Sequence, residues 1–167
     1  MSEQINMEDI AWVLGHTKLS KPVSISTLDG GWDNCNILLE FAEGEKFVLK
    51  AWFANEISEV GRVIERHVHL DNYGIPTVIP LNLDGHGLIA NKDGFAWTLM
   101  PYIEGGFLGS DSTSLRSLGE VLARMHCIPE ADCFPKEYRM GFSFFERVSI
   151  LCRERDLSLG FLDILAR

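Results

Sequence analysis

The sequence lacks the features that mark secreted, membrane-spanning and nucleic-acid-binding proteins. No apolar run approaches the roughly 20 residues that a membrane-spanning helix needs. Residues 1–9 hold three acidic side chains and no apolar stretch, unlike a signal peptide. The net charge of −9 repels phosphate backbones, so nucleic acid is not an expected partner. We therefore expect a cytoplasmic protein that acts on neither nucleic acid nor membranes.

Cysteine and histidine are too scattered for a zinc site or a disulfide framework. The four cysteines form no Cys-x-x-Cys pair, and the histidines lack the spacing of zinc ligands. Four reduced thiols in the cytoplasm are therefore the expectation. The 167 residues, 46% of them hydrophobic, suit one globular domain, or one small lobe with part of another.

The N-terminal part of the chain predicts a short helix, an antiparallel sheet and one longer helix. Asn6 can cap a first helix that Gly15 ends. The apolar residues of segment 55–73 recur at helical spacing. Alternating or short apolar segments predict five strands, at residues 23–28, 36–41, 47–52, 87–90 and 95–103. Strands grouped around one helix indicate an α+β fold.

After residue 106 the pattern becomes helical. Asp111 or Ser112 is the expected cap of a helix with one apolar stripe, which we expect to be core. The stripe consists of Leu115, Leu118, Leu122 and Met125. Another helix is predicted to begin with the capping box Ser143–Glu146. Residues 160–167 resemble the opening of a further helix, so we expect a truncated or partial sequence.

A glycine turn followed by a lysine on the third predicted strand suits the binding of phosphate. Backbone N–H groups at Gly30 and Gly31 can face phosphate oxygens, and Lys50 can supply charge to the α- and β-phosphates. Strand alternation puts Lys50 on one face with Val48 and Trp52, where an ammonium needs an anionic partner. An ordinary hairpin turn and a surface lysine on an edge strand are the alternatives.

Five motifs follow one another at plausible spacing over roughly residues 20–127. They are Gly30-Gly31-Trp32-Asp33-Asn34-Cys35-Asn36, Phe47-Val48-Leu49-Lys50, Tyr73-Gly74-Ile75-Pro76, Met100-Pro101-Tyr102-Ile103-Glu104-Gly105 and the segment from Leu118 to His126. No single motif is specific. In this order, however, they resemble the superfamily of aminoglycoside phosphotransferases, choline kinases and homoserine kinase-like proteins.

The resemblance implies a protein kinase-like N-terminal lobe at residues 1–104, with a five-stranded antiparallel sheet and one long helix. The first helices of an incomplete C-terminal lobe would follow at residues 105–167. ATP is the implied cofactor. Its phosphates would meet a covering loop and a strand lysine, formed by Gly30, Gly31, Trp32, Asn34 and Lys50. Its adenine would meet a hinge between the lobes, formed by Pro101, Tyr102 and Ile103 with Met100 as the pocket wall.

Kinases of this type pair the strand lysine with a glutamate on the first long helix. The usual family pattern, counted back from Gly74, reaches Val63 instead of a glutamate. Glu59 lies one turn earlier on the same face, and Glu65 lies nearby on another side of the helix. We prefer Glu59 as the partner of Lys50 and as part of the nucleotide site, with Glu65 left open.

The sequence contains no catalytic loop of this family. Phosphoryl transfer needs an Asp in a His-x-Asp loop, an Asn a few residues later and a second Asp for Mg²⁺. Only His69-Leu70-Asp71 fits His-x-Asp, but Pro76 stands where the Asn belongs, and the motif falls inside a predicted helix. We therefore expect the chain alone to be inactive, with Mg²⁺ bound only together with the missing lobe.

Three hypotheses remain for the function. The first is the ATP-binding portion of a phosphotransferase that acts on a small alcohol such as homoserine, an amino alcohol or an aminoglycoside. The second is a non-catalytic nucleotide-binding or interaction module built on the same lobe. The third is that only the fold is shared and no nucleotide binds. The oligomeric state cannot be read from the sequence.

Overall fold

The computed structural model describes residues 5–28, 34–106, 108–134 and 150. The chain divides into two compact units, residues 1–133 and 134–167. Nearly all described residues belong to the first unit, and the description below concerns that unit. The helix predicted from Ser143 and the segment 160–167 lie outside the described residues, as do Gly30, Gly31 and Trp32.

Helix α1 spans Met7–Leu14 and begins at the predicted cap. The side-chain oxygen of Asn6 accepts hydrogen bonds from the N–H groups of Glu8 at 2.8 Å and Asp9 at 3.0 Å. The Asp9 carboxylate accepts one in return from the N–H of Asn6 at 3.0 Å. This reciprocal pair is a capping box. The helix ends at Gly15, as predicted.

Five strands form one antiparallel sheet in the order β1-β2-β3-β5-β4. Their bounds are β1 Ser24–Thr27, β2 Cys35–Glu40, β3 Lys46–Trp52, β4 Ala90–Lys92 and β5 Phe95–Pro101. Strand β3 is therefore the middle strand, paired along its length with β2 and β5. The predicted α+β fold with a five-stranded antiparallel sheet is confirmed.

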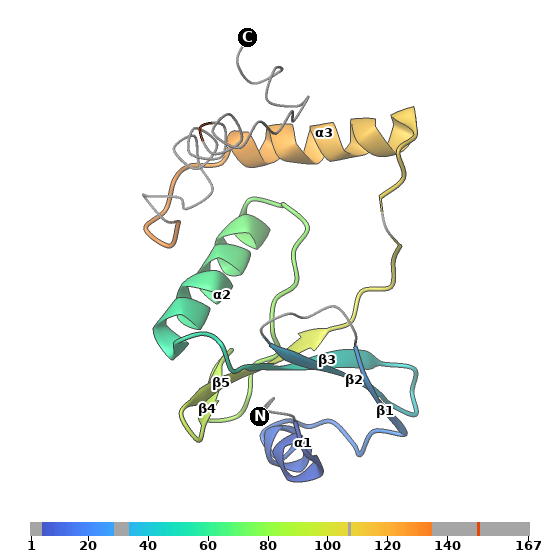
Figure 1. Ribbon diagram of the computed structural model, residues 1–167, viewed down its shortest axis with the longest axis vertical. Coiled ribbons are helices and arrows are strands. Elements are labelled where there is room, and N and C mark those ends of the chain that lie inside the picture. The colour runs from blue at the N-terminus through green and yellow to red at the C-terminus, as the bar shows by residue number, and fades with distance from the viewer. Residues whose placement is uncertain (1–4, 29–33, 107, 135–149, 151–167) are drawn as a thin grey trace. The chain divides into compact units, whose positions relative to one another are not determined.

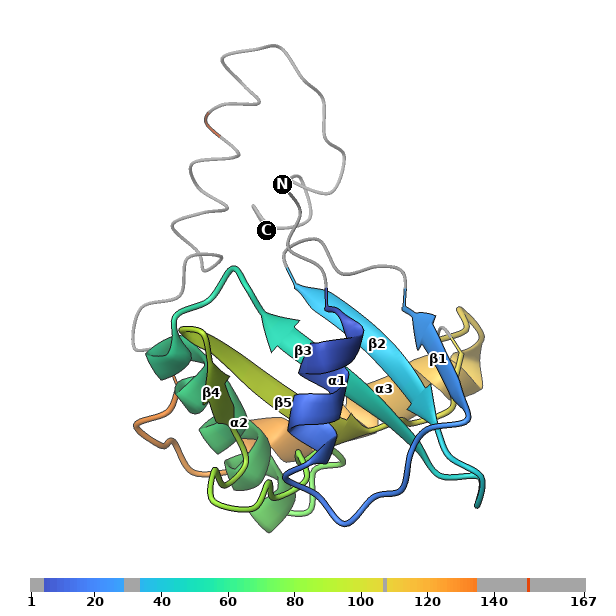
Figure 2. The ribbon, with the colours of Figure 1, turned by 90° about the horizontal axis from the view of Figure 1, so that it is seen from below.

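One helix covers each face of the sheet (Figures 1 and 2). On one face α1 packs through Ile10 and Val13 into a core that includes Leu39, Leu49 and Leu99. On the other face lies α2, which spans Ile57–Asn72. Its buried residues are Val60 and Ile64, and they pack with Trp52 and Ala96. Alternation along β3 thus directs successive side chains into two separate cores.

The fourth strand was predicted wrongly at residues 87–90. It spans Ala90–Lys92, and Asp93 and Gly94 form the turn into β5 with φ of 56° and 84°. Gly87 instead closes a small turn, where it pairs with Leu83 and has a φ of 71°. A backbone in this left-handed region cannot continue as a strand, because strand geometry requires negative φ.

Helix α3 spans Ser112–His126 and is capped by Asp111, whose carboxylate accepts from the N–H groups of Thr113 and Ser114. Its predicted core stripe is wrong for the described structure. Leu115, Leu118 and Leu122 are 53%, 41% and 44% exposed. No described helix is long and apolar enough to cross a membrane.

The cap of α1 gives a direct test of this part of the fold. Asn6→Ala should lower the free energy of unfolding by about 1 kcal/mol, because two backbone N–H groups lose their acceptor. Urea denaturation of the full chain measures the change. Asn6→Ser restores an acceptor and should retain most of the stability, whereas equal losses in both variants would contradict a capping role.

Candidate functional site

Lys50 lies at the centre of the sheet, on the face that α2 covers in part. Its Cα is paired with that of Asn36 on β2 and that of Thr98 on β5. Trp52, two residues further along β3, is on the same face and belongs to the core beneath α2. The register thus fixes the predicted phosphate lysine beside an apolar core, as the sequence analysis expected from strand alternation.

The ammonium of Lys50 lies over an aromatic ring rather than beside a carboxylate. Its Nζ is 3.7 Å from the centroid of the Trp52 ring. The ion pairs found within the described residues involve Lys46 and Lys92, not Lys50. Burial lowers the pKa of Lys50 from its ordinary value of 10.5, because desolvation disfavours the charged form. The site is therefore a partly buried cation for which the described residues supply no counter-ion.

Glu59 takes part in a different set of contacts. Its carboxylate accepts a hydrogen bond from the side-chain amide of Asn55 at 3.4 Å. The amide oxygen of Asn55 accepts in turn from the amide of Asn34 at 3.3 Å. No ion pair joins Lys50 to Glu59 or Glu65 within the described part of the chain. A chain of two amides and a carboxylate therefore connects the end of the glycine loop to α2.

Asn34 is the described end of the predicted phosphate loop. Its amide nitrogen is used in the bond to Asn55, but its side-chain oxygen is buried and accepts no hydrogen bond from the described residues. A buried oxygen without a donor is costly, so it is suited to accept a bond from an arriving group. Gly30, Gly31 and Trp32 lie outside the described residues.

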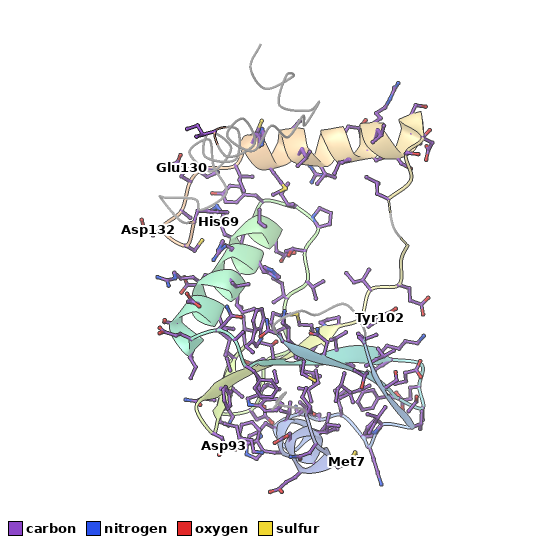
Figure 3. The ribbon with its side chains drawn as sticks, in the orientation of Figure 1. Met7, His69, Asp93, Tyr102, Glu130 and Asp132 are labelled. Atoms are coloured by element: carbon purple, nitrogen blue, oxygen red, sulfur yellow. The ribbon has the colours of Figure 1, made fainter. Side chains whose placement is uncertain are left out.

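The predicted hinge begins at the end of β5 and continues the chain beyond the sheet (Figure 3). Met100 packs against the core beneath α2, and Pro101 is the last residue of β5, opposite Phe47. The N–H of Tyr102 donates to the carbonyl of Lys46 at 3.0 Å. Ile103 is 66% exposed, and no hydrogen bond of the described residues uses its N–H.

Salt bridges connect Glu104, which directly follows the predicted hinge, to Lys46 of β3. The ammonium of Lys46 bonds to the Glu104 carboxylate at 2.8 Å and lies 3.4 Å from that of Glu40. The hydrogen bond and charge of Glu104, with a smaller contribution from Glu40, raise the pKa of Lys46. The same contacts with Lys46 lower the pKa of Glu104. The two lysines of β3 thus differ in their surroundings: carboxylates raise the pKa of Lys46, whereas burial lowers that of Lys50.

The His-x-Asp sequence at His69 lies inside α2, as predicted, and has the surroundings of a helix surface. His69 Nε2 is 3.0 Å from the carbonyl oxygen of Pro129, and Asp71 is exposed. Within the described residues, no group of three or more His, Cys, Asp or Glu side chains could hold a metal ion. The described residues thus offer no such cluster for Mg²⁺.

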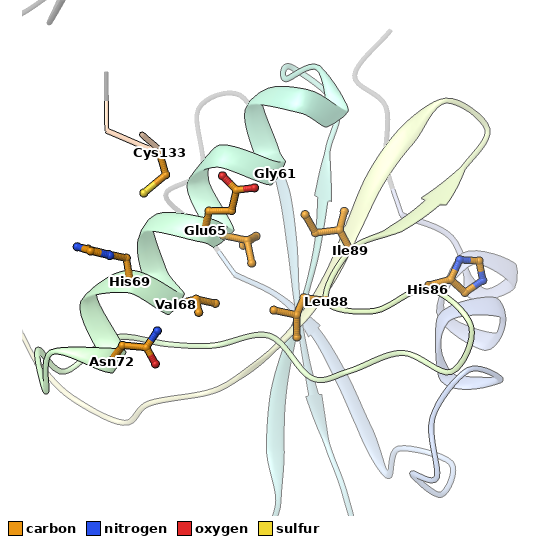
Figure 4. A pocket seen from close by; sticks show the side chains of 10 residues that line it. Gly61, Glu65, Val68, His69, Asn72, His86, Leu88, Ile89 and Cys133 are labelled. Atoms are coloured by element: carbon orange, nitrogen blue, oxygen red, sulfur yellow. The ribbon is translucent and has the colours of Figure 1, made fainter. Parts of the chain in front are cut away.

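A pocket of about 550 Å³ lies elsewhere, between α2 and the segment before β4 (Figure 4). Its lining is mostly apolar, with a few polar side chains from α2. The lining residues are Gly61, Ile64, Glu65, Val68, His69, Asn72, His86, Leu88, Ile89 and Cys133. None of the residues predicted to bind nucleotide is among them, so the pocket and the predicted site are separate.

Comparison with known proteins identifies the family of this chain. A model of the phosphotransferase enzyme family matches residues 24–165, which is most of the chain. The chain belongs to this family. The resemblance stated from the five sequence motifs is therefore confirmed. No curated protein matches the sequence.

Solved structures support the same fold for this family member. One of those that match is a spectinomycin phosphotransferase in complex with ADP and spectinomycin. The TM-score is 0.64 at 13% sequence identity, so the likeness concerns the fold alone. The match covers 89% of this chain but 46% of that protein. This family member thus spans about half of the length of that phosphotransferase.

Strand alternation places Trp52 on the face of Lys50, but the sequence motifs do not identify Trp52, Thr98 or Asn55 as parts of the site. Thr98 is fully buried and accepts a hydrogen bond from the indole N–H of Trp52 at 3.0 Å. The signal for Thr98 was present, since it is one polar residue in the otherwise apolar strand Phe95–Pro101. No sequence motif indicated Asn55. One of its partners, Asn34, is 21 residues away, and the other, Glu59, is one helical turn away.

The two lysines of β3 should respond oppositely to pH. The pKa of Lys50 is lowered by folding, so between this lowered pKa and 10.5 the unfolded chain binds more protons and stability rises with pH. At pH 7 the charged Lys50 therefore opposes folding. Lys50→Met should raise the free energy of unfolding at pH 7, and this gain should shrink as pH approaches 10.5. Urea denaturation across pH measures both.

Lys46→Met is the matched control on the same strand. Because Glu104 and Glu40 raise the pKa of Lys46, its stabilisation is complete below 10.5 and is lost as pH rises through the folded pKa. Lys46→Met should therefore lower stability at pH 7. Two results would contradict the surroundings described for these lysines. One is a gain in stability from Lys50→Met that grows with pH, and the other is a change in stability of the same sign for both variants at pH 7.

Proposed function

We propose that this chain is the ATP-binding portion of a small-molecule phosphotransferase. In this proposal the phosphates contact Lys50 and the loop from Gly30 to Asn34, and the adenine contacts the backbone from Pro101 to Ile103. The N-terminal lobe, residues 1–104, supplies these groups. The complete reaction would transfer the γ-phosphoryl group of ATP to an alcohol such as homoserine, an amino alcohol or an aminoglycoside.

The observation that carries the proposal is the unpaired cation at the centre of the sheet. A partly buried ammonium to which the described residues supply no carboxylate partner is energetically unfavourable, and a phosphate would relieve this cost. Lys50 is paired across the sheet with Asn36, two residues beyond Asn34 at the described end of the glycine loop.

The geometry of the hinge supports the adenine contact. Pro101 has no N–H and the N–H of Tyr102 is bonded to Lys46, so within the described hinge Ile103 offers the next free donor. An exposed backbone N–H at the end of an inner strand can bond to a ring nitrogen, and Met100 can pack against the base. The spectinomycin phosphotransferase of the same fold was crystallised with ADP, which is consistent with this arrangement.

A non-catalytic nucleotide-binding or interaction module is the second candidate. The sequence favours it, because none of its five histidines begins a His-x-Asp loop that an Asn follows at the required position. The described residues also contain no cluster of potential metal ligands. Binding without transfer would separate this candidate from an active enzyme.

Titration with ATP, with and without Mg²⁺, tests the binding proposal by calorimetry on the full chain. Lys50→Ala should weaken binding roughly 10- to 100-fold, the range for loss of a charge-assisted hydrogen bond. Lys18→Ala removes an exposed lysine from the segment between α1 and β1 and should leave binding unchanged. Lack of binding by the unmutated chain would refute the proposal, and equal binding by Lys50→Ala would remove Lys50 from the site.

Turnover tests whether the chain is an enzyme by itself, which neither candidate expects. The chain incubated with ATP, Mg²⁺ and candidate alcohols should release ADP no faster than Lys50→Ala does, because the groups that activate the hydroxyl are absent from its sequence. A coupled assay for ADP makes the measurement. ADP release that depends on both Lys50 and one of the alcohols would show that the chain is an enzyme by itself.

A further inference from the structure

The contact between Lys50 and Trp52 is the basis of this inference. The ammonium nitrogen is 3.7 Å from the centroid of the indole ring, well inside the distance at which a cation is attracted to an aromatic face. Trp52 is 7% exposed, so the contact is largely shielded from water on the side of the ring. Shielding strengthens such a contact, because fewer water molecules compete for the charge.

The ring is itself held in place. The indole N–H of Trp52 donates to the hydroxyl of Thr98 at 3.0 Å, and Thr98 is fully buried. Thr98 is also the cross-strand partner of Lys50. On the other side Val60 and Ile64 of α2 pack in the same core as Trp52. The ring therefore has one orientation, set by a hydrogen bond within the sheet and by packing from a helix.

The carboxylates of α2 do not compete for Lys50 in this structure. Glu59 bonds to Asn55 and is connected through it to Asn34. Glu65 lines the pocket on another part of α2. An aromatic face and a carboxylate differ in one important respect, since the face attracts the ammonium without neutralising it. The charge of Lys50 thus stays available for an anion.

We propose that Trp52, oriented by Thr98, is the positioning residue of this site, and that its ring holds the Lys50 ammonium ready for a phosphate. The inference rests on the proposed nucleotide function and deepens it. A phosphate that arrives at the site can bind the ammonium directly, without first displacing a carboxylate. The ring takes over the orienting part of the role that a helix glutamate has in related kinases.

Three substitutions and one control test this proposal in the full chain. Trp52→Phe keeps an aromatic face but loses the bond to Thr98, and Trp52→Leu removes the face. Thr98→Val keeps the shape of the strand but leaves the indole N–H without its acceptor. Trp12→Leu removes a tryptophan from the helix on the opposite face of the sheet. Circular dichroism and thermal unfolding establish which variants are folded.

The first readout is the affinity for ATP. Trp52→Leu should weaken binding about 5- to 30-fold, as expected for loss of a shielded cation–aromatic contact. Trp52→Phe should stay within about threefold of the unmutated chain, and Trp12→Leu should leave the affinity unchanged. If Trp52→Leu does not fold, Thr98→Val replaces it, and weakening by Thr98→Val beyond that of Trp52→Phe is the supporting result.

The second readout needs no nucleotide and reports on Lys50 alone. The pKa of Lys50 is measured by NMR on lysine labelled with ¹³C, with Lys50→Met to identify its signal. Loss of the ring should lower this pKa further in Trp52→Leu, because the charged form loses its support. Trp52→Phe and Trp12→Leu should leave it close to that of the unmutated chain.

The two readouts distinguish this inference from the proposed function. If the unmutated chain binds no ATP, the proposed function fails, and the pKa of Lys50 still decides whether Trp52 holds the ammonium. If ATP binds and Lys50→Ala abolishes binding, while Trp52→Leu or Thr98→Val changes neither affinity nor pKa, the positioning role of Trp52 is refuted. A loss of affinity equal in Trp52→Leu and Trp12→Leu would refute it as well.

Discussion

The physical constraint on which this site depends is a positive charge at the centre of a largely buried sheet. Lys50 is on the middle strand, with β2 on one side and β5 on the other, so its backbone cannot move away from the core. Its side chain must find stabilising contacts where it stands. In the described structure that contact is the Trp52 ring, and the pairing of strands brings Thr98 and the loop end at Asn34 into the same neighbourhood.

The contrast between the two lysines of β3 shows how far the surroundings determine a residue's chemistry. Both alternate onto the same face, yet Lys46 lies at the exposed end of the strand with two carboxylates, while Lys50 lies half-buried with none. Their pKa values move in opposite directions for that reason. A lysine neutralised by Glu104 contributes to the edge of the hinge. An unpaired one retains its charge for a ligand.

Local patterns were sufficient to predict most of the elements. Strand alternation and the caps at Asn6 and Asp111 are properties of neighbouring residues, so they could be read directly from the sequence. The strand predicted at residues 87–90 was wrong because Gly87 adopts positive φ, which apolar spacing does not reveal. The stripe on α3 was predicted as core because periodicity identifies an apolar face but not what covers it.

The site itself was only partly predictable, since its contacts cross between strands. Lys50 and its shared face with Trp52 followed from alternation along one strand. Thr98 enters only through the register of β3 with β5, and Asn55 only through a bond to a residue distant in sequence. A single sequence does not specify such a register. Single polar residues inside apolar strands, such as Thr98, are therefore the useful signal for contacts of this kind.

Binding and transfer are separable in this architecture for a structural reason. The proposed phosphate lysine lies on β3 and the proposed hinge begins at the last residue of β5. These strands are direct neighbours, so sheet register brings the two together. The groups that activate an alcohol belong to a His-x-Asp loop, and no part of the sheet contributes to them. A chain that folds this sheet therefore assembles the proposed nucleotide contacts whether or not it also carries the transfer groups. Among the described residues, the proposed contacts centre on Lys50, for which no ion pair is found, and on the Trp52 ring proposed to orient it.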